Sequence, residues 1–247
     1  MTVATKPVAI QAGGETAAQF RRVFQALFGR PGIIRATDCA VTQNGTPNMS
    51  VNVAAGQVVV AGTESTSQGY YLVYNDAAVN LTVAAADSTN ARIDLIVAKV
   101  QDQEYSGTVD AASIVVVTGT AAPTPVAPTA PSNSVILAQI AVAANATSIT
   151  NAAITDKRTF VGVQTGATNV VVASGTDSKT FAVTFPTPYA SAPDVQCTPL
   201  EAPGGGFAVV LTSVTATGFA GAVWVTGSTP GSPHTVTVRW HADPTGT

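Results

Sequence analysis

The chain has 247 residues, which is enough for one large β domain or two of ordinary size, and its net charge is −3. Only 10% of its residues are charged, far below the usual share of about a quarter, so Thr, Ser, Asn and Gln must supply most of its polar surface. No basic stripe is present, which argues against a nucleic-acid partner, and no run has the length of a signal-peptide core or a membrane span.

Residues 1–30 are predicted to be an extended arm followed by a short amphipathic helix. Between Glu15 and Phe28 the apolar residues recur at helical spacing, as Ala17, Phe20, Val23, Phe24 and Leu27. Thr16 and Gln19 have the spacing of a capping box, and Gly29 is placed to end the helix. A stripe with two phenylalanines must be covered, either by the chain's own sheet or by a neighbouring subunit.

Residues 31–160 are predicted to be a β-sandwich or barrel-like module of strands and turns. The run from Ile93 to Val100 has apolar residues on both faces of a period-2 pattern, so we expect it at the centre of a sheet covered on both sides. The charges near its ends are expected to reach water; they are Arg92, Asp94, Lys99, Asp102 and Glu104. The segment 119–133 contains four prolines and no charge, which predicts an extended crossing between strands.

Residues 15–160 resemble the N-terminal module of tail-fibre and baseplate proteins of tailed bacteriophages. The resemblance is one of order and spacing, and the residues that carry it read TPNMSVNVAAGQVVV, NDAAVNLTVAAADSTNARIDLIVAKVQDQEYSG and VVTGTAAPTPVAPTAPSNSVILAQIAVAANATSITNAAITDKR. It implies a module that attaches to other tail or baseplate proteins of a virion.

Residues 161–168 are predicted to be a linker, and residues 169–247 a second β domain. Its segments VTFPTPYASAPDV, VTATGF and VRWHA look like those of an H-type lectin domain, a six-stranded β-sandwich. That resemblance implies a homotrimer and a host-surface glycan as ligand. The sugar-binding members place polar clamps, including an arginine, where this chain reads GGGFAVVL. The resemblance therefore implies the fold and the trimer more directly than the ligand.

The last two strands predict which side chains of the second domain are exposed. Trp240 alternates with Val236 and Val238 and is expected in the core, whereas Trp224 is expected on the opposite face of its own strand. The loop 226–234 joins these strands, so the proposed receptor or glycan site consists of Trp224, His234, Arg239 and His241. The alternative is that Trp224 packs at a subunit interface.

The sequence offers no catalytic, cofactor or metal site. His234 and His241 have no Cys or carboxylate at a ligand-like spacing, and the carboxylates of the second domain all fall in predicted loops. We therefore expect that the chain is not an enzyme. Cys39 and Cys197 are expected to be unpaired thiols.

Three functions fit these observations. The favoured one is a structural component of a phage tail or related injection particle, assembled in the host cytoplasm and exposed on the virion, whose C-terminal domain adsorbs to the host. The second is a virion protein that only trimerises or decorates. The third is a free carbohydrate-binding lectin.

Overall fold

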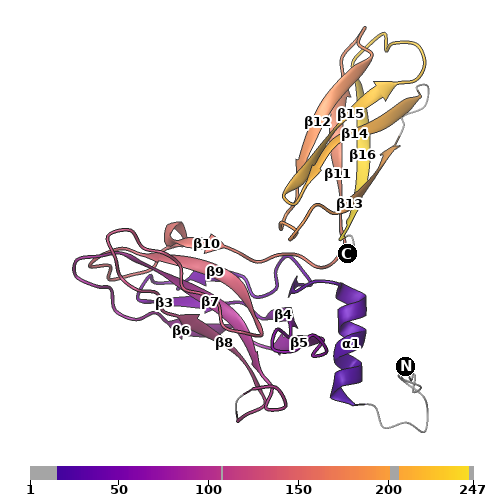
Figure 1. The fold of residues 1–247 in the computed structure, drawn as a ribbon. Coiled ribbons are helices and arrows are strands. Elements are labelled where there is room, and N and C mark those ends of the chain that lie inside the picture. The colour runs from indigo at the N-terminus through magenta and orange to yellow at the C-terminus, as the bar shows by residue number, and fades with distance from the viewer. Residues whose placement is uncertain (1–15, 107, 201–205, 245–247) are drawn as a thin grey trace. The chain divides into compact units, whose positions relative to one another are not determined.

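The computed structural model describes residues 16–106, 108–200 and 206–244 of the chain. It is mainly β, with a single α-helix in the described part, as the sequence predicted (Figure 1). The chain divides into two compact units, unit 1 comprising Met1–Arg158 and unit 2 comprising Thr159–Thr247. Each unit has its own antiparallel sheets.

Unit 1 contains two small sheets and one larger one, all antiparallel. The first small sheet has the order β1-β4-β5, with β1 Gly32–Ile33, β4 Gly56–Ala61 and β5 Tyr70–Asn75. The second has the order β2-β3-β6, with β2 Val41–Gln43, β3 Ser50–Val53 and β6 Val79–Thr82. The larger sheet has the order β10-β9-β7-β8, with β7 Arg92–Gln101, β8 Ala111–Val117, β9 Ser134–Val142 and β10 Ile154–Asp156, the last preceded by a 3-10 turn Asn151–Ala153.

Strand β7 is the centre of unit 1, as its apolar pattern predicted. It pairs with β9 on one side and β8 on the other, and Leu95, Ile96, Val97 and Ala98 are all almost fully buried. Consecutive side chains on a strand point to opposite faces, so both faces of β7 are covered. The proline-rich segment after β8 forms no strand, in agreement with the predicted crossing.

The charges at the start of β7 do not reach water, contrary to expectation. Arg92 is 5% and Asp94 0% exposed, and the guanidinium Nε lies 3.0 Å from Asp94 Oδ1. Arg92 also donates to the carbonyls of Ala84 and Ala85, while Asp94 accepts from the amide of Gly119. The pair is buried because it satisfies the backbone of two segments that cross the end of the sheet.

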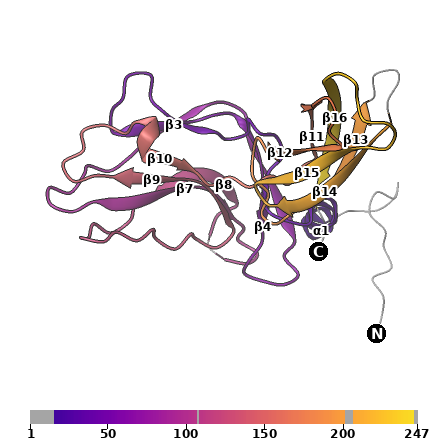
Figure 2. The ribbon, with the colours of Figure 1, turned by 90° about the horizontal axis from the view of Figure 1, so that it is seen from above.

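Helix α1, Ala17–Phe28, has the predicted ends. Thr16 and Gln19 form the reciprocal capping box, and Gly29 closes the helix in the left-handed conformation with φ 64°. The helix contacts β5 and β4; Figure 1 shows it beside both strands, and Figure 2 shows it beside β4. Its fully buried residue is Arg21, not one of the predicted apolar stripe.

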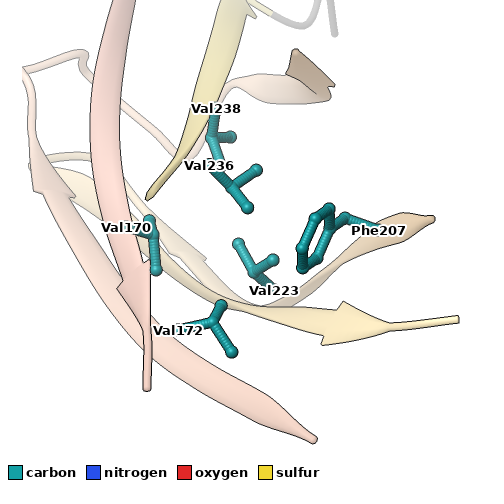
Figure 3. Packing of buried hydrophobic residues seen from close by; sticks show 6 residues of the cluster. All are labelled: Val170, Val172, Phe207, Val223, Val236 and Val238. Carbon is teal, nitrogen blue, oxygen red and sulfur yellow. The ribbon is translucent and has the colours of Figure 1, made fainter. Parts of the chain in front are cut away.

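Unit 2 is a six-stranded β-sandwich in its described residues, which agrees with the predicted fold class. One sheet has the order β11-β16-β13, with β11 Gln164–Val172, β16 His234–Asp243 and β13 Asp194–Leu200. The other has the order β12-β15-β14, with β12 Ser178–Thr184, β15 Gly218–Val225 and β14 Phe207–Thr215. Figure 3 shows the side chains that fill the space between the sheets, namely Val170, Val172, Phe207, Val223, Val236 and Val238.

The predicted linker 161–168 is shorter in the structure, because β11 already begins at Gln164. Gly166 lies within the predicted linker, yet it pairs with Trp240 inside the sheet. A Cβ at this position would lie 2.4 Å from Cζ2 of Trp240. A glycine is therefore needed here so that the indole of Trp240 can pack against the backbone of β11.

Candidate receptor-binding surface

The outer face of the β12-β15-β14 sheet is uncharged and carries an exposed tryptophan. Trp224 is 47% exposed, as expected from the alternation of β15, and its cross-strand neighbours are Ser178 and Ala208. Val210 on the same face is 50% exposed. The other positions of this face are small or hydroxylated: Thr180, Ala182, Ser213, Ala220 and Ala222. A flat indole among small side chains leaves room for a ring to stack on it.

The outer face of the β11-β16-β13 sheet is polar. Arg239 and His241 are both exposed on β16, where they alternate with buried Val238 and Trp240. Arg239 lies between Ala167 and Thr198 in the sheet, and Thr237 donates to the side chain of Asn169 at 2.9 Å. This face also carries the carboxylates of Asp194 and Asp243 at one end and the exposed apolar side chains of Val171 and Leu200.

The four residues of the predicted site are not brought together. Trp224 lies on the outer face of one sheet, whereas Arg239 and His241 lie on the outer face of the other, with the core between them. The loop 226–234 was expected to hold them close, but it connects the two sheets of the sandwich. The outward-facing side chains of the two strands that it joins therefore point in opposite directions.

His234 belongs to neither outer face. Its ring stacks on Phe207, with centroids 5.3 Å apart and an interplanar angle of 22°. Its Nε2 is buried and has no hydrogen-bond partner among the described residues. The imidazole thus packs at the end of the core and is poorly placed to meet a receptor.

A groove of about 1040 Å³ lies in unit 1, and no pattern in the sequence predicted it. Its lining residues come from α1, β5 and the adjacent ends of β7 and β8; the apolar ones include Phe20, Phe24, Leu72, Val73 and Val100. At its edge stand three carboxylates, those of Asp102, Glu104 and Asp110. Groups from four separate elements form this groove, so no local pattern could have revealed it.

A polar cluster beside the groove fixes α1 to the rest of unit 1. The guanidinium of Arg21 lies 3.3 Å from Asp102 and donates to the carbonyl of Gln68 and the hydroxyl of Tyr105. Tyr71 donates to Asp102 at 2.7 Å, and burial together with this hydrogen bond raises the pKa of Tyr71 to about 12. All of these contacts join residues of unit 1, so they hold α1 in place on the rest of the unit.

The described residues contain no group of three or more His, Cys, Asp or Glu able to hold a metal ion. Cys39 and Cys197 are unpaired, and Cys39 is buried. In the part of the chain that the structure describes, no helix is long and apolar enough to cross a membrane.

Three phage tailspikes are similar to part of this chain. They are the tailspike protein gp49 of Pseudomonas phage LKA1 (26% identity, TM-score 0.30), the Gp54 tailspike of Acinetobacter baumannii bacteriophage AP22, solved with an A. baumannii capsular saccharide (15%, 0.29), and the tailspike gp61 of Pseudomonas phage phi297 (19%, 0.30). The similarity covers 32%, 33% and 35% of this chain and 14%, 16% and 16% of those proteins. No protein-family model and no curated protein matches the sequence.

Proposed function

We propose that this chain is a structural component of a phage tail or related injection particle that adsorbs to the host surface through unit 2. In this proposal unit 1 attaches to other tail or baseplate proteins, and the chain acts as a homotrimer on the virion. The order and spacing of the segments in residues 15–160 support the attachment role. The observation that carries the adsorption role is Trp224, held 47% exposed on an uncharged sheet face.

The Trp224 face suits a neutral sugar ring. An indole stacks on the apolar face of a sugar, and the hydroxyls of Ser178 and Thr180, on the adjacent strand β12, can supply hydrogen bonds. Stacking on one tryptophan is worth on the order of 1 kcal/mol, so one site binds weakly. Three sites presented together convert that weak contact into useful avidity.

Trp224→Ala in the full chain tests the adsorption role. We expect roughly a 5-fold loss of affinity at each site, and about 100-fold for a trimer bound through all three, because 1.4 kcal/mol corresponds to a factor of ten. His241→Ala, on the other face of the sandwich, serves as the matched control and should bind host cells like the parent. Equal binding by Trp224→Ala and the parent would place the receptor contact elsewhere.

A second candidate function is a virion protein that trimerises or decorates without a receptor. The small side chains around Trp224 favour it, since Ala208, Ala220 and Ala222 would let a flat neighbouring surface approach closely. Under this alternative Trp224→Ala impairs assembly of the homotrimer, and any trimer that still forms binds host cells no differently from the parent. Immunogold labelling of particles distinguishes both candidates from a free lectin, which would leave the particles unlabelled.

A further inference from the structure

Helix α1 packs on the rest of unit 1 through a face centred on Arg21, whereas an ordinary amphipathic helix packs through its apolar face. Its buried residue is Arg21, whereas Phe20 is 49% and Leu27 71% exposed. At 3.6 residues per turn, Phe20, Val23 and Leu27 lie about 100° to 160° around the helix from Arg21. The rest of unit 1 therefore covers one edge of the apolar stripe, and it leaves Phe20 and Leu27 exposed and Val23 half-buried; these three residues are here called the outer stripe.

The polar cluster holds the helix in this orientation. Arg21 makes its contacts with Asp102, Gln68 and Tyr105 within unit 1, so rotating α1 to bury the outer stripe would pull a guanidinium away from its partners. Exposing a phenylalanine and a leucine side by side is costly in water, and exposed apolar patches of this kind mark interaction surfaces. The outer stripe is therefore a candidate surface for contact with another molecule.

The charges on either side of the outer stripe indicate what covers it. On one side the stripe borders the groove, whose lining includes Glu104, 3.6 Å from Arg21, and Asp110, which accepts hydrogen bonds from Gln103. On the other side is Arg22, which is exposed and forms no ion pair with any residue that the structure describes. Unit 1 thus has an apolar groove with the carboxylates of Glu104 and Asp110 in its lining. It also has an apolar stripe with the guanidinium of Arg22 beside it. These two features are complementary to each other.

We propose that the occupant of the groove is helix α1 of a second copy of this chain. Val23 and Leu27 of one copy then pack on Phe20, Phe24 and the strand residues that line the groove of the next copy. Arg22 of the first copy faces the carboxylates of Glu104 and Asp110 in the second. In the proposed homotrimer each copy places its helix in the groove of one neighbour and receives the helix of the other, so that three such contacts form a closed ring. This inference rests on the proposed homotrimer and assigns its interface to unit 1, leaving the Trp224 face free.

The first test is sedimentation velocity of the full chain over a range of concentrations. Leu27→Gln should raise the concentration needed for association at least 10-fold, since it places an amide in the groove of the neighbour. Gln25→Ala, at an exposed position about 40° around the helix from Arg21 and outside the face that carries Val23, Leu27 and Arg22, is the matched control and should associate like the parent. Leu27 is largely exposed in the single chain, so circular dichroism should find both variants folded.

The second test reverses the charges. Arg22→Glu and Asp110→Arg should each weaken association several-fold, and the double variant should recover most of it. If the parent associates and Leu27→Gln associates equally well, or if the double variant is no better than the singles, the α1 interface is wrong although the trimer stands. A parent that stays monomeric at every concentration overturns both. Adsorption through Trp224 is measured independently, on cells.

Discussion

The buried pair at the start of β7 allows a quantitative prediction for Asp94→Asn. The substitution keeps the shape of the side chain but leaves the guanidinium of Arg92, 5% exposed, without its counter-charge. Removing one partner of a buried ion pair costs about 3–5 kcal/mol of unfolding free energy. With a urea m-value of about 2 kcal/mol/M for a unit of this size, the unfolding midpoint should fall by roughly 1.5–2.5 M.

The chain contains its own control for this experiment. Asp156 and Arg158 form a similar pair two residues apart, but the Asp156 side chain is 53% exposed, so water can solvate the change. Because the Arg158 side chain left behind is itself only 9% exposed, Asp156→Asn should also destabilise unit 1, but less than Asp94→Asn, since water reaches the Asp156 side chain directly. Both tryptophans lie in unit 2, at positions 224 and 240, so far-UV circular dichroism follows both units while tryptophan fluorescence follows unit 2. If Asp94→Asn shifts the dichroism midpoint no further than Asp156→Asn, the burial argument fails.

Two further predictions concern packing and pH. Gly166→Ala should destabilise unit 2 by about 1–3 kcal/mol in tryptophan-detected urea unfolding, because its Cβ would meet the buried indole of Trp240; Gly227→Ala, which meets nothing within 4 Å, should be neutral. Burial raises the pKa of the Cys39 thiol from 9.0 to about 11, so the unfolded chain loses this proton first and stability should fall as pH rises from about 9 to about 11. The unfolding free energy of Cys39→Ala should fall less steeply with pH between about 9 and 11 than that of the parent. An equally steep fall in the variant would show that Cys39 is not the group responsible.

Local patterns predicted the parts of the fold that depend on local chemistry. The capping box of Thr16 and Gln19 and the left-handed Gly29 fixed the ends of α1, because each depends on residues within one turn. The two-sided apolar run of β7 placed it correctly at the centre of a sheet, and the alternation of β15 and β16 placed Trp224 outside and Trp240 inside.

Features that depend on long-range pairing could not be found in this way. The sequence predicted that Arg92 and Asp94 would be solvated at the end of a strand. Their actual partners are the carbonyls of Ala84 and Ala85 and the amide of Gly119, which come from segments whose positions are defined only in the folded chain. The predicted site failed to assemble for the same reason. Proximity along the chain across loop 226–234 gave no information on which sheet each strand joins.

The uncharged face around Trp224 also has a consequence for the speed of recognition. Charged partners attract each other over about 8 Å at physiological ionic strength, and such steering raises association rates well above the unsteered range of about 10⁵–10⁶ M⁻¹s⁻¹. A face without charge provides no such attraction, so each encounter depends on random diffusion and correct orientation. The contact proposed for this face should therefore form slowly, at a rate nearly independent of salt concentration.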